Sequence, residues 1–444
     1  MIQCKLGPNE TQTAFGPLCA FGHYLTQNRV LEPLEDVAVI QKTVKHSPAQ
    51  KLTDALIGML AGCSALYEIN AKVRPDLPLQ KAFGRERCAE QSTISDTLNA
   101  FDEQTVLGLR KAVEAIHRQH SPIFSHDYFG REMLVVEVDL SGLSASKRAE
   151  GSTKGYFSGK RNRTGRQLVR ASAPQYQEIL FEKLYPGNTT SCEVLKGTIE
   201  EVERVLELSE EPEKRGRTLI RIDGGFGTDE NLEWLCERSY QFIAKGYSGG
   251  RAKKVARSVP EEDGWREGPT PGQELGRPTK PHHYQRETIT VVRRWTDQKG
   301  KLHQDLLVST LVDLGEEEIA KLYDGRGAME VDIKGDKRGL GIEKRTKKSF
   351  WAQEALVLLA QLAHNLAAWF KGWFLAGTAA GGLGMERLVR EVFAMPAQVR
   401  VGRRWSATKA LIELPNLHPW AKAVADGLRT RFPPSGSWAI WGKT

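Results

Sequence analysis

Apolar residues recur at helical spacing from Pro48 to about His120. They return every three or four positions, and no alternating strand pattern interrupts them, which predicts several packed helices. Gly84 provides a stop and Ser92–Thr93 a helix cap. The two predicted helices across Leu79–Phe101 are typical of a helix-turn-helix, although helical packing without DNA contact is the commoner cause of such a pattern.

The pattern changes at Met133, where short apolar runs begin to alternate with amphipathic stretches. Several strands followed by strand–helix alternation predict an α/β fold, with a mixed sheet flanked by helices. The predicted strands are 133–140, 167–173, 178–184, 218–223 and 240–244, and the predicted helices are 193–208 and 229–238.

A less regular region follows the predicted sheet. Residues 249–284 are rich in glycine, proline and charge, which predicts an insertion or a mobile loop. Two further strands, 288–295 and 306–312, are predicted on either side of a turn at 297–301. After Gly315, a helix that begins with three glutamates is predicted to run toward Lys337, because acidic residues in a first turn suit the helix dipole.

The composition is that of a folded protein with several domains. The chain has 444 residues, 40% hydrophobic and 27% charged, so it can bury a core and is expected to form two to three domains. Its 63 Lys and Arg against 55 Asp and Glu give a net charge of +8, which favours an acidic partner such as nucleic acid. None of the 6 cysteines is spaced as CxxC, so we expect no zinc ribbon and no disulfides, as in a reducing cytoplasm.

Other classes of protein find no support in the sequence. The most apolar stretch, Ala355–Phe370, contains Gln361, His364 and Asn365, so a buried helix is expected there and no membrane span. The first residues lack a basic region followed by an apolar run, so no secretory signal is expected. No P-loop, serine-esterase or zinc-protease motif occurs in the chain.

Two aspartates occupy positions where α/β proteins place their chemistry. Asp139 and Asp223 each stand at the carboxyl end of a predicted apolar strand. Strand ends converge there, while the loops leave room for a ligand. A carboxylate at this position also serves as a turn or helix cap, so neither aspartate alone identifies a site.

Four polar residues share one stripe of the helix predicted after Gly315. They are Tyr323, Arg326, Glu330 and Lys337. At about 100° per residue, they project within about 60° of one another. One interpretation is a solvated helix face with an Arg–Glu pair four residues apart. The other is a carboxylate flanked by groups that bind phosphate.

The spacing Tyr-x2-Arg-x3-Glu-x6-Lys resembles the signature of bacterial insertion-sequence DDE transposases. This resemblance implies a ribonuclease-H-like core, in which two aspartates end strands and a glutamate lies on a helix. It implies that Asp139, Asp223 and Glu330 are catalytic and hold Mg²⁺, for which Mn²⁺ can substitute. The segments 139–143 with 165–168, and 222–226, also resemble family patterns.

The chain departs from the family pattern at two places. Gly325, Gly327 and Gly335 fall within the predicted helix, each at a cost of about 1 kcal/mol relative to alanine, so a frayed or bent helix is expected. Glu137 lies two residues before Asp139 on the same strand face. Either can be the first ligand, and we favour Asp139 because it ends the apolar run.

The resemblance implies a cut-and-paste DNA transposase, which cleaves transposon ends and transfers the strands into target DNA with Mg²⁺. It implies double-stranded DNA as the partner, no membrane, a homodimer on the DNA ends and a place in the bacterial cytoplasm with the nucleoid. The alternatives are a stand-alone metal-dependent nuclease and a catalytically inactive DNA-binding relative. The sequence leaves open the terminal DNA sequence, the target preference and whether excision passes through a hairpin.

Several side chains are candidates for DNA contact. In the helical signature, Tyr323, Arg326 and Lys337 can bind phosphate. Basic residues are concentrated at 147–170 and 334–348. Both runs follow a proposed metal ligand, so they predict a DNA path.

Other candidates lie further from the signature. Arg163 and Arg166 belong to the first basic run. The small hydroxyls of the predicted helix-turn-helix that can bond phosphates or base edges are Ser92, Thr93 and Ser95. Trp295 lies in the insertion, where some relatives place a tryptophan that stacks on a flipped base. Trp265 is a competitor for that role, and core packing is the ordinary role of both.

We therefore predict five regions. They are a helical, helix-turn-helix-like DNA-binding region at 1–125, a first part of the catalytic core at 126–248, a β-rich insertion at 249–312, a second part of the core with the glutamate helix at 313–375, and a C-terminal region of open role at 376–444.

Overall fold

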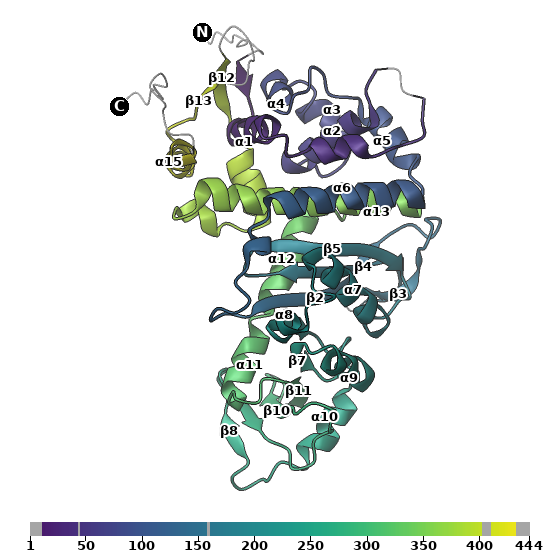
Figure 1. Cartoon of the computed structure of the whole chain (residues 1–444), viewed down its shortest axis with the longest axis vertical. Helices are drawn as coiled ribbons and strands as arrows, with labels where there is room; N and C mark the ends of the chain where they lie inside the picture. Colours follow the sequence, from purple (N-terminus) through teal and green to yellow (C-terminus); the bar gives the residue numbers. More distant parts are fainter. Residues whose placement is uncertain (1–10, 43–44, 158–159, 402–409, 432–444) are drawn as a thin grey trace. The chain divides into compact units, whose positions relative to one another are not determined.

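The computed structural model describes residues 11–42, 45–157, 160–401 and 410–431 (Figure 1). The chain divides into two compact units. The first holds the described residues of Met1–Ser121, Arg148–Glu150 and Asp332–Thr444, and the second holds those of Pro122–Lys147 and Gly151–Val331. The second unit thus begins close to the predicted boundary at residue 125, whereas most of 313–375, predicted as core, lies in the first unit.

The first unit is mainly helical. Its helices are α1 (Gly16–Gln27), α2 (Pro48–Leu60), α3 (Glu68–Lys72), α4 (Leu77–Ala82), α5 (Gln91–Asn99), α6 (Glu103–His120), α13 (Phe350–Phe370), α14 (Met385–Arg387) and α15 (Ala421–Arg431). A small antiparallel sheet joins both ends of the chain, because β12 (Ala397–Val401) pairs with β1 (Gln12–Thr13) and with β13 (Ala410–Glu413). The described residues after 376 therefore pack with the N-terminal part of this unit.

The most apolar stretch of the sequence forms the centre of this unit. Helix α13 is capped by Ser349, whose side chain accepts from the backbone N–H of Ala352. Its residues are buried on nearly every side, and it packs against α2, α5 and α6. The prediction of a buried helix is confirmed. Among the described residues, none of the helices has the length and apolar character needed to cross a membrane.

The predicted helix-turn-helix corresponds to α4 and α5. Gly84 follows α4 with a positive φ of 68°, which glycine adopts readily, so it ends the helix as expected. The predicted cap at Ser92–Thr93 is wrong. Helix α5 begins at Gln91 after Glu90, with no side-chain cap, so both hydroxyl residues lie inside its first turn.

The second unit is built on a ten-stranded mixed sheet. Its strands are β2 (Leu134–Ser144), β3 (Thr153–Phe157), β4 (Lys160–Ala173), β5 (Glu178–Pro186), β6 (Thr218–Ile222), β7 (Gln241–Lys245), β8 (Trp265–Glu267), β9 (Gln273–Gly276), β10 (Ile289–Thr296) and β11 (Leu302–Ser309). The order is β3-β4-β2-β6-β7-β11-β10-β9-β8, with β5 also beside β4. Strands β2, β6 and β7 are parallel and the other pairs antiparallel. The predicted α/β class is confirmed.

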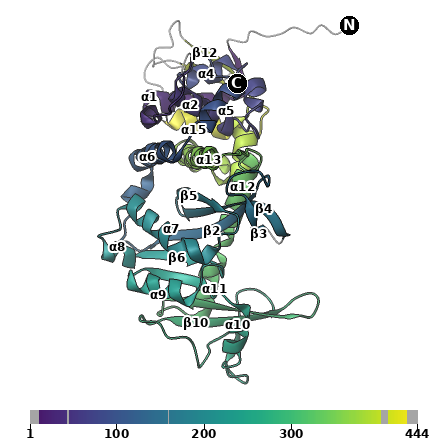
Figure 2. The same ribbon diagram turned by 90° about the vertical axis from the view of Figure 1, so that its right-hand side faces the viewer.

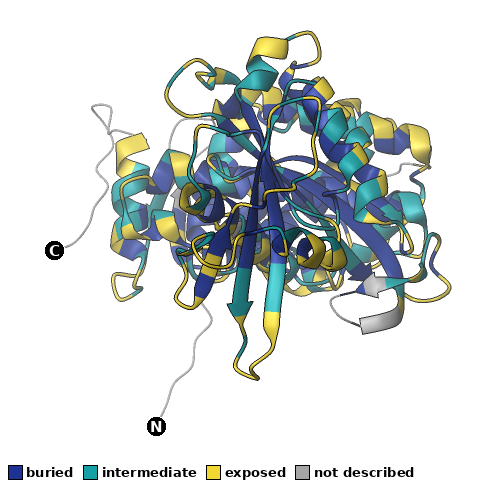
Figure 3. Cartoon of the chain, turned by 90° about the horizontal axis from the view of Figure 1, so that it is seen from below, coloured by how far each residue is buried: buried dark blue, intermediate teal, exposed yellow. Residues whose placement is uncertain are grey.

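Side-chain alternation gives the sheet two apolar faces. Leu134, Val136 and Val138 of β2 face the larger core, which is covered by α7 (Ser191–Leu206), α9 (Asp229–Glu237) and α10 (Gly249–Ala256). The short helix α8 (Pro212–Gly216) precedes β6. Helix α11 (Glu316–Asp324) covers the opposite face (Figure 2). Figure 3 shows that the strands are largely buried and the helices expose their outer sides.

The segment predicted as a loop is more regular than expected. Residues 249–284 contain α10, β8 and β9. Ser248 caps α10, and Ala252 and Ala256 pack into the larger core. The strands β10 and β11 continue the main sheet, because β11 pairs with β7. The β-rich insertion is thus an extension of the core sheet.

Candidate active site

Asp139 and Asp223 follow the last paired residues of two parallel strands. In the β2–β6 pair, Val138 is opposite Ile222, and each aspartate is the next residue of its strand. Because side chains alternate between faces, both aspartates lie on the face that α11 covers. The charge of Asp139 acts on Asp223. The sheet therefore brings together two of the three carboxylates predicted from the sequence.

The strand of Asp139 does not end where the apolar run ends. Strand β2 continues to Ser144, because β4 pairs with it from Glu137 to that residue. Only the pairing with β6 stops at Val138. The prediction that Asp139 ends its strand is wrong, and the aspartate instead lies where one neighbouring strand stops and the other continues.

The guanidinium of Arg326 lies against the two aspartates. Its Nη2 donates to Oδ1 of Asp139 at 2.8 Å and approaches the Val138 carbonyl at 3.5 Å. The side chains of Arg326 and Asp139 are 11% and 18% exposed, so this ion pair is mostly screened from water. Asp223 also interacts electrostatically with Arg326. The two carboxylates thus share one cation supplied by the chain.

The environment of Asp223 perturbs its carboxylate. Burial raises its pKa above the ordinary value, and the charge of Asp139 raises it further, while Arg326 opposes both effects. The backbone N–H of Gly225 donates to its Oδ1 at 2.9 Å. Such a group favours a nearby cation, because a positive charge offsets the cost of its buried negative charge.

Glu137, the alternative first ligand, is engaged elsewhere. It is fully buried, and its carboxylate pairs with the guanidinium of Arg221. Arg221 also donates to the Leu322 carbonyl at 2.7 Å. Sequence reasoning missed Arg221, although a lone charge within the apolar strand β6 was a signal for it. Asp139, which is partly exposed and close to Asp223, is the better candidate.

The predicted signature helix is two helices. Helix α11 ends at Asp324, and α12 (Gly327–Gly339) begins after Arg326. The physical reason is the pair of glycines on either side of Arg326, since glycine disfavours a helix interior. The prediction that the four signature residues share one stripe of a single helix is therefore wrong, because Arg326 lies in the break between two helices. This break was anticipated in part by the expected bend.

Tyr323 lies inside the fold. It is 9% exposed and packs in the smaller core with Ile319. The guanidinium of Arg293 lies over its ring, 5.0 Å from the centroid. Burial raises the pKa of Tyr323 to about 12. Packing in the core is enough to explain why a tyrosine stands at this position of the Tyr-Arg-Glu-Lys signature. A hydrogen bond from Tyr323 to a DNA phosphate therefore stays a prediction.

Glu330 lies in the first turn of α12 and is exposed, whereas Lys337 in the last turn is half-buried. Within the described ranges, no three His, Cys, Asp or Glu side chains form a group that could hold a metal ion. The structure therefore places Asp139 with Asp223 but does not assemble them with Glu330. The metal-binding role of Glu330 stays a prediction.

A chain of ion pairs continues beside the aspartates. Lys245 follows Ala244, which pairs with Ile222, so Lys245 is the neighbour of Asp223 on the sheet. Its Nζ lies 3.1 Å from Oδ2 of Asp305. Arg293 donates to both oxygens of Asp305 at 2.7 Å. The sequence signal for this network was a charged residue within each of two largely apolar strands, Arg293 in β10 and Asp305 in β11.

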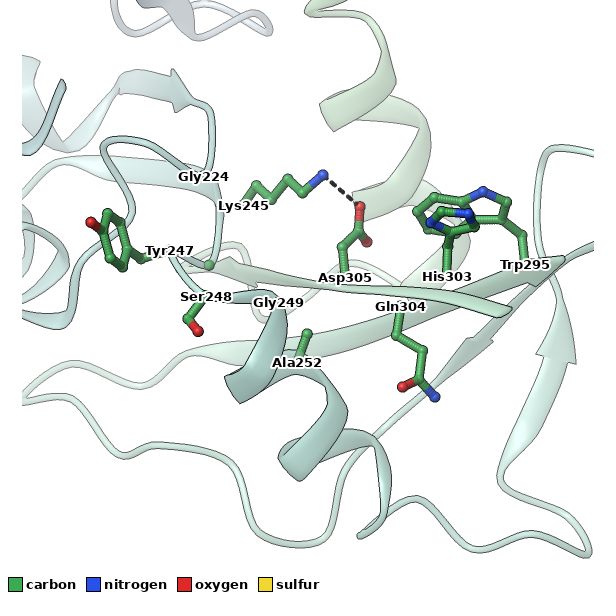
Figure 4. Close-up of a pocket in the computed structure, with 11 residues that line it drawn as sticks. Gly224, Lys245, Tyr247, Ser248, Gly249, Ala252, Trp295, His303, Gln304 and Asp305 are labelled. Carbon is green, nitrogen blue, oxygen red and sulfur yellow. Dashed lines mark ion pairs between the residues drawn. The ribbon is translucent and has the colours of Figure 1, made fainter. Parts of the chain in front are cut away.

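A pocket of about 330 Å³ lies next to this network (Figure 4). Trp295 and His303 line it with stacked rings, 5.6 Å apart and inclined by 14°. The remaining lining residues are Gly224, Lys245, Gly246, Tyr247, Ser248, Gly249, Ala252, Gln304 and Asp305. Trp265 is not among them, since its ring packs under the Arg294 guanidinium, 3.7 Å away. Of the two tryptophans considered, Trp295 is the one that lines this pocket.

The two arginines of the first basic run differ in exposure. Arg163 is exposed on β4, whereas Arg166 is 1% exposed. Residue 166 lies between β2 and β5, opposite Leu143 and Pro186, which accounts for its burial. The burial of Arg166 contradicts its prediction as a surface contact for DNA, whereas a DNA contact from the exposed Arg163 stays a prediction.

The hydroxyls of the helix-turn-helix differ as well. Ser92 is exposed, whereas Thr93 and Ser95 are half-buried. The ammonium of Lys347 donates to the Ser95 hydroxyl and carbonyl. Ser92 therefore remains the accessible candidate, and Ser95 has a structural partner within its own unit.

Comparisons with known proteins place the chain in a family. The model of the family described as transposase DDE domain group 1 matches residues 28–431. No curated protein matches the chain significantly in sequence. A cryo-EM structure of the piggyBac transposase synaptic complex with hairpin DNA is similar with a TM-score of 0.45 and 12% identity, over 95% of this chain and 83% of that chain.

Proposed function

Because the chain belongs to the group 1 family of transposase DDE domains, we propose that it cleaves transposon ends and joins them to target DNA. The observation that carries this proposal is the position of Asp139 and Asp223, each directly after the last paired residue of two adjacent parallel strands, with a cation held against them. Paired carboxylates beside basic surfaces suit phosphodiester chemistry.

The two aspartates fit a divalent cation in their donor chemistry. Carboxylate oxygens are the ligands that Mg²⁺ and Mn²⁺ prefer, and the Arg326 guanidinium is a stand-in cation on Asp139. Asp139 and Asp223 would hold the ion, with Glu330 as the third ligand. When bound, divalent ions supply activation of an attacking oxygen and stabilisation of a leaving one.

Basic and hydroxyl side chains would bind the DNA. Arg163 is exposed and follows the strand of Asp139, and Lys337 follows Glu330 on α12. In the helix-turn-helix, Ser92 is exposed in the first turn of α5. We assign double-stranded DNA as partner, two copies of the chain on a pair of ends, and a place in the cytoplasm with the nucleoid, where that DNA lies.

Trp295 is the proposed stacking partner for an extruded base. It lines a pocket that also contains Gly224, the residue after Asp223, so a base there would lie next to the nucleotide being cleaved. Aromatic stacking holds an unpaired base without regard to its identity. Trp295→Ala should lower the yield of excision while cleavage of the first strand is retained, as gel analysis of the products would show.

The decisive experiment uses DNA that carries the segments flanking the reading frame of this protein. The wild-type chain is incubated with these ends, plasmid target and Mg²⁺, and the cut and joined strands are mapped. We expect Asp223→Asn to lower cleavage by about 10³-fold or more, because a metal ligand is lost, with DNA binding retained. Glu262→Gln, an exposed carboxylate after α10, is the matched control.

The alternatives make different products in this assay. A stand-alone nuclease would cut the DNA with Mg²⁺ but never join an end to the plasmid. An inactive relative would retard the DNA in a gel and leave it intact. Cleavage at the wild-type rate by Asp223→Asn would remove this pair of aspartates from the mechanism.

A further inference from the structure

The proposed metal ligands already hold a cation that belongs to the chain. Arg326 donates to Asp139 at 2.8 Å, and its charge interacts with Asp223. This arrangement rests on the proposed function only for the identity of the two aspartates as metal ligands. The position of the guanidinium itself is a property of the fold.

A neighbouring cation is needed because the two carboxylates are close and poorly solvated. Like charges that share a site disfavour each other, and burial adds to that cost. The side chain of Asp139 is 18% exposed and Asp223 is half-buried. Hydration therefore offsets little of the cost of placing these two negative charges together. Arg326 is similarly enclosed, at 11% exposure, so the three groups form a compact cluster.

The buried guanidinium of Arg326 does not use all of its hydrogen-bond donors. Among the described atoms its Nε has no hydrogen-bond partner, although it is buried. A buried donor without a partner carries a desolvation cost. Arg326 is therefore held mainly by charge, and a stronger cation at the aspartates would displace it at a modest loss of hydrogen bonds.

The backbone around Arg326 leaves room for such a displacement. Arg326 stands between Gly325 and Gly327, in the break between α11 and α12. An added Cβ at Gly327 would meet nothing within 4 Å, so the main chain is unobstructed on that side. Glycine also permits a wider range of backbone angles than other residues.

We propose that Arg326 is a positioning residue that competes with divalent cations. In the metal-free chain it holds Asp139 and Asp223 together, and it leaves them when a divalent ion binds. The released guanidinium is then free to contact a DNA phosphate, the role that the sequence pattern predicts for it. The competition lowers the apparent affinity of the free chain for metal, because the ion must first displace Arg326.

The test measures Mn²⁺ binding by the full chain without DNA, by titration calorimetry and by loss of the free Mn²⁺ EPR signal. Arg326→Ala should bind Mn²⁺ roughly tenfold more tightly than the wild type, since a charge-assisted hydrogen bond no longer competes. Arg326→Lys, which keeps a cation without the planar fork, should fall between them. Lys321→Ala removes one exposed positive charge of α11 and should leave the affinity unchanged.

A second measurement uses the wild-type chain, so it does not depend on whether Arg326→Ala folds. The protein is labelled with ¹⁵N-arginine, and the Nε–H signal of Arg326 is identified by its absence from the spectrum of Arg326→Lys. Adding Mg²⁺ should shift this signal and speed its exchange with water. An unchanged signal at a Mg²⁺ concentration that saturates binding would overturn the proposal.

The outcomes separate this inference from the proposed function. Equal Mn²⁺ affinity of the wild type and Arg326→Ala, with weaker binding by Asp139→Asn, would overturn the competition and leave the metal site in place. Equal binding by the wild type, Arg326→Ala and Asp139→Asn would show that Mn²⁺ does not bind at these aspartates. That result would remove the proposed metal site and the inference with it.

Discussion

At the scale of single residues, burial decides which charged side chains can act. Asp139 and Arg326 are enclosed together, whereas Glu137 is fully buried and already paired with Arg221. Arg163 and Arg166 come from the same basic run, yet only Arg163 is exposed. A charged residue in a sequence is thus a candidate whose role depends on its surroundings.

The raised pKa of Asp223 makes a prediction about pH. Because the folded pKa lies above the unfolded one, the folded state binds the proton more tightly and metal-free stability falls as pH rises through the folded pKa. Asp223→Asn removes this penalty and should raise the free energy of unfolding at pH 7 by about 1 kcal/mol, a usual size for such stabilising changes. Urea unfolding in EDTA would measure it.

The same measurement at acidic pH provides the check on the sign. Once the pH falls below the folded pKa, Asp223 is itself neutral in the native state, so the advantage of the asparagine should shrink. An advantage that grows toward acidic pH would mean that Asp223 is stabilised as a carboxylate, in conflict with its burial.

At the scale of elements, the break between α11 and α12 is the main local departure from regular structure. Two glycines bracket Arg326, and they differ in what surrounds them. An added Cβ at Gly325 would lie 2.9 Å from Nη1 of Arg221, while at Gly327 it would meet open space. Arg221 cannot move freely, because it is bonded to Leu322 and Glu137.

The two glycines therefore predict opposite effects of alanine. Gly327→Ala should raise the free energy of unfolding by up to about 1 kcal/mol, the difference in helix propensity between the residues. Gly325→Ala should lower it by about 1 kcal/mol or more, since crowding against a fixed side chain outweighs that gain. Urea denaturation of the pair would test this, and equal stabilisation by both would show that Arg221 yields easily.

At the scale of the whole molecule, the proposed function predicts that the positive net charge of +8 would act on DNA through the charges that are exposed. Each phosphate contact releases counterions, so log affinity falls with log salt in proportion to the number of contacts. Within the basic run at 147–170, only the exposed lysines and arginines would contribute to this dependence of DNA affinity on salt. Arg163 and Arg166 form a matched pair for testing that point.

Arg163→Ala should reduce the slope of log affinity against log salt by about one, and it should leave thermal stability nearly unchanged. Arg166→Ala should instead lower the free energy of unfolding by about 2 kcal/mol, because it removes a buried side chain. Fluorescence anisotropy across a salt series and thermal melts would measure the two effects. A loss of salt slope in a stably folded Arg166→Ala would place that arginine on the DNA after all.

Much of the fold follows from local patterns along the sequence. The short apolar runs at 133–140 and 218–223 predict β2 and β6, and the nearly continuous apolar run at 355–370 predicts the buried helix α13. These elements depend on periodicities that each segment carries by itself. The order of Asp139, Asp223 and Glu330, and the tendency of the glycine-rich helix to break, were likewise visible in the sequence.

The tertiary structure decided which of these residues meet. Arg326 reaches Asp139 across 187 positions of the chain, a contact that depends on which strands are neighbours and which face α11 covers. The burial of Arg166 depends on β2 and β5 lying on either side of β4. The pairing of Trp295 with His303 at a cavity depends on the register of β10 and β11. No short segment carries this information, because strand order and burial are set by the packing of the entire sheet.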